Sequence, residues 1–329
     1  MHLLAVTETN DRSEVELYCA LVARGHKVDL ICSPLWRGEA PLIRGGVDVI
    51  KMPIRHRLDL HASGEIRHMI HRRSHDLIYA VLNRQIAVSL LATRAHKHIP
   101  VIGYRGTTGH LSRFDPASWL TYFHPRLKGI VCVSEAVRQY LLSKRIPDDR
   151  LHTIHKGHRP EWYDSDQTVD LSEFGIPEGA FVIGFTGNIR PVKGVDVLLR
   201  ALPLIPSELN VHALLVGEVR DERIAALAAN PTIANRVHLA GYRTDAAVLA
   251  GACQAFVMPS IEREGLPRAV IEAMSQCVPA IVSNVGGLPE LVEDGVTGLV
   301  VPPRDPGALA TAIAELASDR QQCHAMGLA

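Results

Sequence analysis

The chain has 329 residues, of which 47% are apolar and 21% are charged, which allows two globular domains with sizeable cores and excludes fibrous and disordered proteins. Its formal net charge is zero, but the charge is divided unevenly. The first 160 residues hold 24 Lys and Arg against 14 Asp and Glu, a net charge of +10, and the remainder holds 11 against 21, a net charge of −10.

The six cysteines show no C-x-x-C spacing, which favours buried, reduced thiols over disulfides or metal ligands. They are Cys19, Cys32, Cys132, Cys253, Cys277 and Cys323. The first apolar run ends at Val6, too short for a secretory signal peptide, and no run approaches the roughly 18 residues of a membrane span. These features predict a cytoplasmic protein, and the basic first half allows peripheral contact with the inner face of a membrane.

Short apolar runs alternate with helix-period segments through the first half. The predicted strands span residues 2–6, 27–32, 48–52, 76–81, 100–104 and 129–133. The predicted helices span residues 14–24, 65–73, 84–97 and 135–143. This alternation is typical of a parallel-sheet α/β domain.

A basic, histidine-rich stretch runs from Arg55 to His75. It can be the solvated face of an ordinary helix, or it can contact an anionic membrane surface or an anionic acceptor molecule, at about 1 kcal/mol per well-placed cation. The sequence leaves both interpretations open. Nucleic acid is not expected as a partner, because no aromatic side chains for base stacking accompany the charge.

Helical and strand periodicity breaks at residues 156–168, which are predicted to join a domain over 1–160 to a domain over 161–329. Asp164, Ser165 and Asp166 form a D-x-D triplet in this linker. The triplet does not follow a strand, so we interpret it as linker polarity and not as a metal site.

The second half repeats the plan of the first without repeating its sequence. The predicted strands span residues 181–186, 211–216, 237–240, 255–258, 280–283 and 298–301. Helical segments separate them, including 195–204 and 266–277. The second half is therefore predicted to be another parallel-sheet α/β domain.

The loop after the first of these strands carries two cations. Gly187 and Asn188 form a turn in which a ligand can approach the backbone closely, and Arg190 and Lys193 follow three residues apart. The two side chains can converge on one anion and neutralise a pyrophosphate without a metal ion. Alternatively, Lys193 only opens a helix and Arg190 is solvated.

Two carboxylates eight residues apart flank another strand-to-helix junction. Glu264 is predicted in the loop after a buried strand and Glu272 inside the next helix, about 12 Å away at 1.5 Å per residue. The amides of Gly265 and Leu266 lie between them at the positive end of the helix dipole, which suits a phosphate. Glu272 could instead pair with Arg268 on a solvated helix face, but the position at the carboxyl end of a parallel strand favours a ligand site.

Two further junctions are predicted at the same sheet edge. Tyr242 and Arg243 offer an aromatic ring and a guanidinium to a nucleotide base. Residues 284–290 form a glycine-rich turn before a helix start. Together with the loop cations and the carboxylates, these junctions favour a nucleotide-sugar site.

Jointly, these motifs resemble the retaining family-4 glycosyltransferases of the GT-B fold. The resemblance is carried by residues 187–194, by Glu264-x7-Glu272, by Gly-Gly-Leu-Pro-Glu at 286–290 and by Asp-Gly-Val-Thr-Gly at 294–298. It implies two Rossmann-like α/β domains whose parallel sheets face across a cleft, the first binding the acceptor and the second the nucleotide-sugar donor.

By this resemblance Arg190 and Lys193 hold the donor diphosphate, Glu264 contacts sugar hydroxyls, and Glu272 contacts the ribose. The resemblance implies a hexosyltransferase that works without a metal ion or other cofactor in polysaccharide or glycolipid biosynthesis. It would transfer a sugar from a nucleoside diphosphate to a hydroxyl of a glycan, lipid or small molecule, with retained anomeric configuration and no protein nucleophile.

The chain departs from the family pattern in three places. Residues 9–13 replace the usual Gly-Gly turn after the first strand. Where many members carry a histidine after the strand at 100–104, this chain has Arg105, followed by His110. Arg105 is a candidate for binding an anionic acceptor and His110 a candidate polar group there, although both can be ordinary loop side chains. The chain stops at Ala329, where members usually continue into a helix that returns to the first domain.

Two other functions compete with sugar transfer. The chain could be a nucleotide-sugar epimerase or hydrolase on the same fold, or a non-catalytic subunit that binds nucleotide sugars. A Rossmann dehydrogenase is disfavoured, because no Gly-x-Gly-x-x-Gly follows the first strand.

Overall fold

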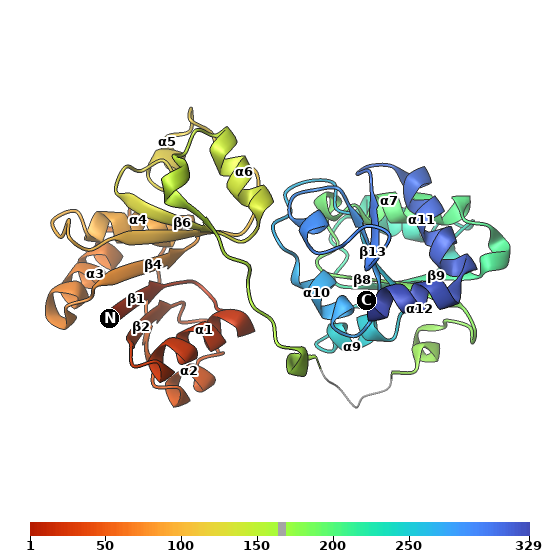
Figure 1. Cartoon of the computed structure of the whole chain (residues 1–329), viewed down its shortest axis with the longest axis horizontal. Helices are drawn as coiled ribbons and strands as arrows, with labels where there is room; N and C mark the ends of the chain where they lie inside the picture. The colour runs from red at the N-terminus through yellow and green to blue at the C-terminus, as the bar shows by residue number, and fades with distance from the viewer. Residues whose placement is uncertain (164–168) are drawn as a thin grey trace. The chain divides into compact units, whose positions relative to one another are not determined.

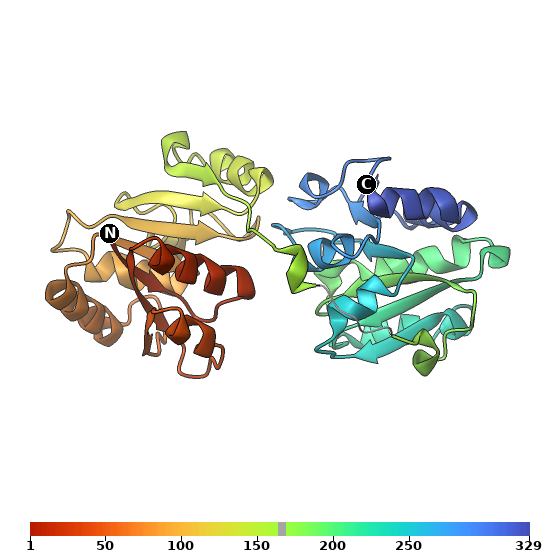
Figure 2. The same ribbon diagram turned by 60° about the horizontal axis from the view of Figure 1, so that its bottom comes forward.

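A computed structural model of the chain describes residues 1–163 and 169–329, and these residues form two compact units, 1–157 and 158–329 (Figure 1). Each unit contains one parallel β-sheet with helices packed against it (Figures 1 and 2). The D-x-D triplet at 164–166 lies outside the described residues. Among the described helices, none combines the length and apolar character that crossing a bilayer requires.

The first unit contains a seven-stranded parallel sheet with strand order β3-β2-β1-β4-β5-β6-β7. Its strands are β1 (His2–Val6), β2 (Lys27–Cys32), β3 (Asp48–Lys51), β4 (Leu77–Val81), β5 (Val101–Arg105), β6 (Leu127–Cys132) and β7 (Leu151–Thr153). Its helices are α1 (Arg12–Ala23), α2 (Ala40–Arg44), α3 (Leu60–Arg73), α4 (Asn83–Ala92), α5 (Pro116–Trp119) and α6 (Glu135–Ser143).

The second unit contains a six-stranded parallel sheet with strand order β10-β9-β8-β11-β12-β13. Its strands are β8 (Phe181–Thr186), β9 (Val211–Val216), β10 (Val237–Gly241), β11 (Ala255–Met258), β12 (Ala280–Ser283) and β13 (Gly298–Val301). Its helices are α7 (Val195–Ala201), α8 (Glu222–Ala228), α9 (Ala246–Gly251), α10 (Arg268–Met274), α11 (Pro306–Ser318) and α12 (Arg320–Leu328).

The strand order fixes which helices share a face. Crossovers between parallel strands are right-handed. While successive strands are added toward one edge of the sheet, their crossover helices therefore lie on one face, and once strands are added toward the other edge, the helices lie on the opposite face. In the first unit the direction reverses between β3 and β4, which separates α1 and α2 from α3 and α4 (Figure 1). The second unit reverses in the same way between β10 and β11.

Central strands are buried on both faces, which explains their predominantly apolar sequences. Every residue of β8, β9, β11 and β12 is buried. A strand covered on both faces has no polar side, so its sequence lacks the alternation of a half-exposed strand. These apolar runs made the strands of the second sheet predictable to within a residue.

The helix boundaries differ from the sequence predictions for local reasons. Helix α1 begins at Arg12 and not at 14, because Asp11 and Glu14 form a capping box in which Asp11 accepts from the Glu14 amide at 3.0 Å. Helix α3 begins at Leu60 and not at 65, because the Asp59 carboxylate caps it through the Ala62 amide. Both aspartates lie among other polar loop residues, so the sequence pattern did not identify them as N-caps.

Helix α10 is shorter than predicted, because it begins at Arg268 and ends at Met274 instead of spanning 266–277. Pro267 is the N-cap with an extended backbone (ψ 122°), so it does not lie in the first turn. Leu266 precedes a proline, which disfavours helical conformation there. The positive φ of Cys277 (59°) excludes it from the helix.

The shortest elements escaped prediction, because a periodic pattern cannot be recognised over three to five residues. Strand β7 is three residues long and exposes His152, and helices α2 and α5 are only one turn each. All six cysteines are free; Cys32, Cys132, Cys253 and Cys323 are buried, Cys19 is partly buried, and Cys277 is exposed.

Candidate functional site

The reversal of strand order after β10 brings β11 next to β8, and the exit loops of these two neighbouring strands lead to opposite faces at the carboxyl edge of the second sheet; we call this place the reversal point. Such a reversal point is where open α/β sheets bind ligands, because the two loops separate and leave room between them. The β8 exit loop carries Lys193 and the β11 exit loop carries Glu264, which places two of the predicted residues at the reversal point.

Lys193 and Glu264 form an ion pair at this point. The Lys193 Nζ atom donates to Glu264 Oε1 at 2.6 Å, and the Ser260 hydroxyl donates to the same oxygen at 2.6 Å. Glu264 is 7% exposed and Ser260 is fully buried. The sequence analysis predicted both charged residues but missed Ser260, whose only signal was its place in the β11 exit loop.

Two glycines allow the loops to approach this closely. A Cβ atom on Gly194 would lie 1.9 Å from the carbonyl oxygen of Pro259, and one on Gly286 would lie 2.2 Å from the carbonyl oxygen of Glu264. Both glycines have positive φ, 68° and 57°, which also disfavours any other residue. The β8, β11 and β12 exit loops therefore pack backbone to backbone around Glu264.

The amides of Gly265 and Leu266 follow Glu264. Among the described residues, neither amide donates a hydrogen bond to a protein acceptor. Gly265 is buried and Leu266 is partly buried. Donors placed in this way can be satisfied by an anionic ligand beside the ion pair.

Glu272 is a half-buried carboxylate on α10. Burial raises its pKa above the ordinary value of 4.5, and the positive charge of Arg268 opposes that shift. The two side chains are not within ion-pair distance in the described structure, so the alternative of a surface pair is not realised. Glu272 is available to accept hydrogen bonds from a ligand hydroxyl.

The predicted donor residues of the β8 exit loop are exposed, and they do not all converge. Gly187, Asn188 and Arg190 are exposed, whereas Lys193 is partly buried in its pair with Glu264. Arg190 lines a separate pocket of about 380 Å³ that also contains Arg220 and residues at the start of α8. The structure therefore brings Lys193 to Glu264 and leaves Arg190 beside this second pocket.

The β10 exit loop carries the predicted base contacts. Tyr242 is 81% exposed. The Arg243 guanidinium donates to both carboxylate oxygens of Asp245, at 2.8 and 2.7 Å, and lies over the Phe174 ring. Arg243 is thus held by the protein itself, while the Tyr242 ring is open to a ligand.

The first unit has its own reversal point, between β1 and β4. Glu8 in the β1 exit loop accepts hydrogen bonds from Arg84 and from Gln85, each at 2.9 Å. Asn10 in the same loop is 9% exposed, and neither polar atom of its amide has a hydrogen-bond partner in the described structure. Asn10 lies within residues 9–13, which replace the glycine turn expected of the family, and neither Asn10 nor Glu8 was assigned a role from the sequence.

Arg105 and His110, the predicted acceptor residues, lie together beside this reversal point and line one pocket. Arg105 is 8% exposed, and its Nε donates to the Thr107 carbonyl at 2.9 Å while an Nη atom donates to the Gly109 carbonyl. Its guanidinium lies over the Tyr122 ring. Arg105 is therefore a buried cation, and the alternative of a surface arginine is wrong.

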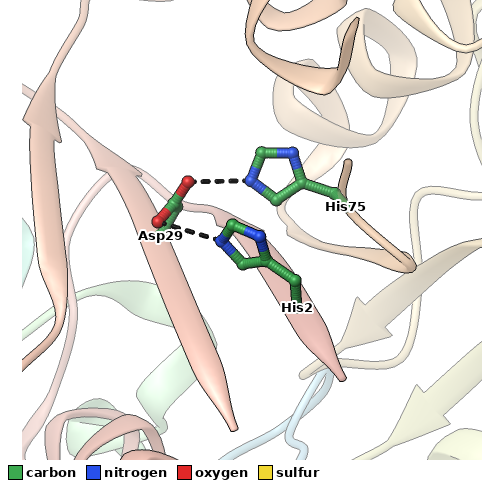
Figure 3. Close-up of side chains that lie close together, drawn as sticks. All are labelled: His2, Asp29 and His75. Atoms are coloured by element: carbon green, nitrogen blue, oxygen red, sulfur yellow. Dashed lines mark hydrogen bonds and ion pairs between the residues drawn. The ribbon is translucent and has the colours of Figure 1, made fainter. Parts of the chain in front are cut away.

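Another polar cluster, His2, Asp29 and His75, gathers near the amino-terminal edge of the first sheet (Figure 3). His75 Nε2 lies 2.8 Å and His2 Nε2 3.2 Å from the carboxylate of Asp29, which also accepts from Arg73 at 2.9 Å. The three ligand atoms lie within 4.8 Å of one another, as in a metal site. Because the fixed charge of Arg73 would repel a cation, we interpret the group as a hydrogen-bonded cluster around the Arg73–Asp29 ion pair.

Two protein families match the chain. The model described as "Glycosyltransferase Family 4" matches residues 12–162, and the model described as "Glycosyl transferases group 1" matches residues 180–319. The two matched ranges follow one another and together cover most of both structural units.

Curated relatives share part of the chain. A D-inositol 3-phosphate glycosyltransferase of Mycolicibacterium gilvum is 29% identical over 203 residues, covering 57% of this chain and 44% of the relative. An N-acetyl-alpha-D-glucosaminyl L-malate synthase of Bacillus anthracis is 30% identical over 167 residues, covering 50% of this chain and 44% of the relative. The chain thus spans less than half the length of these two relatives.

A solved structure resembles the whole chain. HepE of Anabaena in complex with UDP is 21% identical, with a TM-score of 0.82 over 99% of this chain and 93% of that protein. This likeness, with the two parallel sheets, shows the fold of two Rossmann-like domains predicted from the sequence.

Proposed function

The chain belongs to the group 1, family-4 glycosyltransferases, and from that premise we propose that it transfers a sugar from a nucleoside diphosphate to a hydroxyl group of an acceptor. The observation that carries the proposal is the Lys193–Glu264 ion pair at the reversal point of the second sheet. A cation beside a carboxylate supports the proposal, because the cation can bind a diphosphate and the carboxylate can accept from sugar hydroxyls.

In this proposal the second unit binds the donor. Lys193 binds the diphosphate together with the amides of Gly265 and Leu266, and Glu264 accepts from sugar hydroxyls. Arg190 is exposed on the same exit loop, and in this proposal its side chain turns toward the diphosphate from the neighbouring pocket. Glu272 accepts from the ribose, and Tyr242 packs on the base. Structures of HepE contain UDP and UDP-glucose, which supports a nucleotide sugar as the class of donor.

The proposed reaction retains the anomeric configuration. The acceptor oxygen forms a bond to the anomeric carbon on the face that the diphosphate leaves, and the bond from that carbon to the phosphate oxygen breaks. The electron pair leaves with the diphosphate, and the hydroxyl proton moves to a donor phosphate oxygen. No protein nucleophile takes part, so the protein contributes orientation and stabilisation of the leaving diphosphate.

The positive charge for this step comes from Lys193, Arg190 and the loop amides, so the proposed reaction needs no metal ion. Proteins can stabilise a leaving phosphate with fixed donors alone when these are already in position. Activity in the presence of EDTA tests this part of the proposal.

The first test is thermal unfolding of the full chain in EDTA with UDP, GDP, ADP and their common sugar conjugates. A ligand present at 100 times its dissociation constant stabilises the folded state by about 2.7 kcal/mol. We expect one nucleotide family to raise the melting temperature of the wild type. In Lys193→Ala the same nucleotides should cause no shift relative to the free variant, whose own melting temperature is the reference because the variant loses the ion pair with Glu264.

Turnover then separates transfer from its alternatives. A product in which the sugar is joined to an added acceptor, with the α or β configuration of the donor, supports the proposal. Release of free sugar or of an epimer without acceptor would instead identify a hydrolase or epimerase, and donor binding without turnover would identify a binding subunit. No shift with any nucleotide would overturn the assignment of the donor site.

A further inference from the structure

A pocket of about 650 Å³ opens at the carboxyl edge of the first sheet, among the loops that follow β3, β4 and β5. Four arginines and two histidines line it: Arg55, Arg57, Arg84, Arg105, His56 and His110. None of its described lining residues is acidic. The volume is typical of sites for small molecules, which hold about 300–1,000 Å³.

Arg105 is the deepest of these cations. It is 8% exposed, and its hydrogen bonds go to the backbone carbonyls of Thr107 and Gly109, which are neutral. In the described chain no carboxylate lies within ion-pair distance of it. A buried guanidinium without a counter-ion is unfavourable, so the pocket favours binding of an anion.

Arg55 and Arg57 add positive charge that is also not paired. The Nε atom of Arg57 is buried and has no hydrogen-bond partner in the described structure. Asp59 and Asp115 are the acidic side chains whose pKa values these arginines help to lower, but hydrogen bonds from backbone amides are the larger cause in both cases. Both carboxylates cap helices, α3 and α5, and are thereby engaged.

Arg84 differs from the other three arginines because it has a carboxylate partner. Its guanidinium donates to Glu8 at 2.9 Å and contacts the Arg55 carbonyl at 3.4 Å, so it is held at the rim of the pocket between two loops. One of the four guanidinium charges is therefore balanced by the protein, and three are not.

The backbone around the pocket adopts unusual conformations. Leu82 (φ 73°) and His110 (φ 56°) both line the pocket with positive φ, which is rare for residues other than glycine. Such conformations persist where the surrounding structure enforces them, and they concentrate at ligand sites. The loops after β4 and β5 are thus fixed in shapes that their local sequences do not favour.

We propose that this pocket binds the acceptor of the transfer reaction and that the acceptor carries a phosphomonoester group. The proposal rests on the proposed function and deepens it by naming the class of acceptor. A phosphomonoester has a charge of about −1.5 to −2 at pH 7 and three acceptor oxygens, so it can engage several arginine forks at once. A single carboxylate would balance only one of the three unpaired guanidinium groups.

The test measures binding to the full chain without donor, so that it does not depend on turnover. The soluble probe is glycerol 3-phosphate, compared with glycerol, by calorimetry. The lipid probe is a phosphatidylcholine vesicle with or without phosphatidic acid, by co-sedimentation. Binding of glycerol 3-phosphate but not of glycerol indicates a soluble phosphorylated acceptor, and binding only to vesicles with phosphatidic acid indicates a phosphorylated lipid.

Substitutions test which side chains bind the phosphate of the probe. We expect Arg105→Gln to weaken binding of the phosphorylated probe by about 10- to 100-fold, the loss typical of charge-assisted hydrogen bonds. Arg57→Gln, which changes a less buried residue, tests the same pocket if Arg105→Gln fails to fold. Arg67→Gln, on the exposed surface of α3, is the matched control for loss of an arginine outside the pocket. Lys193→Ala tests whether the probe binds at the proposed donor site instead. Both variants should bind the phosphorylated probe with an affinity within about twofold of the wild type.

Three results would overturn the proposal: no binding of either phosphorylated probe, equal binding of glycerol, or equal losses in Arg105→Gln and Arg67→Gln. The nucleotide-dependent melting shift is measured on the same samples. If that shift is present while the phosphorylated probes fail to bind, the acceptor assignment is wrong and the donor proposal stands. If the probes bind at Arg105 while no nucleotide shifts the melting temperature, the donor proposal is wrong instead.

Discussion

The environment of Glu272 differs from that of an ordinary surface carboxylate. Its half-buried side chain makes no ion pair with Arg268 in the described structure, and burial raises its pKa. A carboxylate without a protein partner at the carboxyl edge of the sheet can accept hydrogen bonds from two neighbouring hydroxyl groups of a ligand. In the proposed function these are the hydroxyl groups of the ribose.

We expect Glu272→Ala to weaken donor binding by about 1.5–3 kcal/mol, the value of hydrogen bonds to a charged group. Calorimetry with the nucleotide sugar identified by the melting screen measures this loss. Glu315→Ala, which removes an exposed carboxylate from α11, is the control and should bind donor like the wild type. Unchanged donor affinity in Glu272→Ala would remove it from the site.

The raised pKa of Glu272 adds a pH dependence. Only the ionised carboxylate accepts hydrogen bonds from both of its oxygens, and its ionisation moves to a pH above the ordinary 4.5. Donor affinity of the wild type should therefore fall as the pH is lowered toward and through this raised pKa, and the affinity of Glu272→Ala should fall less over the same range.

Sequence reasoning singled out the charged residues of the proposed donor site but not the pairing of Lys193 with Glu264. Lys193 and Glu264 were predictable because each follows a buried apolar strand, where a polar loop at a sheet edge is evident. That they share a hydrogen bond depends on how two loops 71 residues apart pack together. Local sequence carries no information on that packing, and for the same reason the Glu8–Arg84 pair went unassigned.

At the scale of elements, the proposed donor site depends on the contact between the β11 and β12 exit loops. Gly286 lies against the Glu264 backbone so closely that a Cβ atom would be 2.2 Å from its carbonyl oxygen. We expect Gly286→Ala to displace the Glu264 loop, to destabilise the fold by more than 2 kcal/mol (about 1–2 kcal/mol from positive φ alone), and to weaken donor binding.

The control for this contact is Gly295→Ala. Gly295 also has positive φ (77°), but a Cβ atom there would meet no atom within 4 Å. The substitution imposes a similar backbone strain without a collision, so it should cost only about 1–2 kcal/mol and leave donor affinity unchanged. Equal effects of the two substitutions in denaturation and calorimetry would show that backbone strain alone explains Gly286.

Helix α10 shows where element-level prediction fails. The apolar run after Leu266 indicates a helix, and one is present, but the proline at 267 marks its boundary and not its first turn. A proline near a helix start can be the N-cap or the first helical residue, and the sequence allows either position. The extended ψ of Pro267 in the structure identifies it as the N-cap.

At the scale of the whole molecule, buried imidazoles make stability depend on pH. Burial lowers the pKa values of His75, His124, His212 and His238. The unfolded chain therefore takes up protons first as the pH falls below about 6.5, so the folded state loses stability from that pH downward until each lowered pKa is reached. Both units contain such residues, so acid destabilises both.

His75 allows this effect to be isolated. Its side chain is fully buried and contacts Asp29 at 2.8 Å (Figure 3). We expect the urea midpoint of the wild type to fall between pH 7 and pH 5, and that of His75→Gln, which does not titrate, to fall less. His26→Gln, at a residue outside this cluster for which burial is only partial, should match the wild type. An identical decrease in His75→Gln and the wild type would contradict the assignment.

The overall architecture was the most predictable level, because it depends on repeated local signals. Each apolar run such as 181–186 or 255–258 could be identified alone, and their alternation with helices required a parallel sheet. The strand order, with its reversal in each unit, depends on contacts between distant segments such as β1 with β4, which no local signal encodes.

The glycine contacts around Glu264 also bear on how new specificities could arise on this scaffold. Gly194 and Gly286 pack against neighbouring backbone, so the path of the proposed donor loops is fixed by these contacts. A substitution that changes the path would also destabilise the fold. Divergence toward another sugar or base would then proceed through exposed side chains such as Tyr242, while the frame beneath them stays constant. A directed-evolution library for altered donors should accordingly leave both glycines untouched.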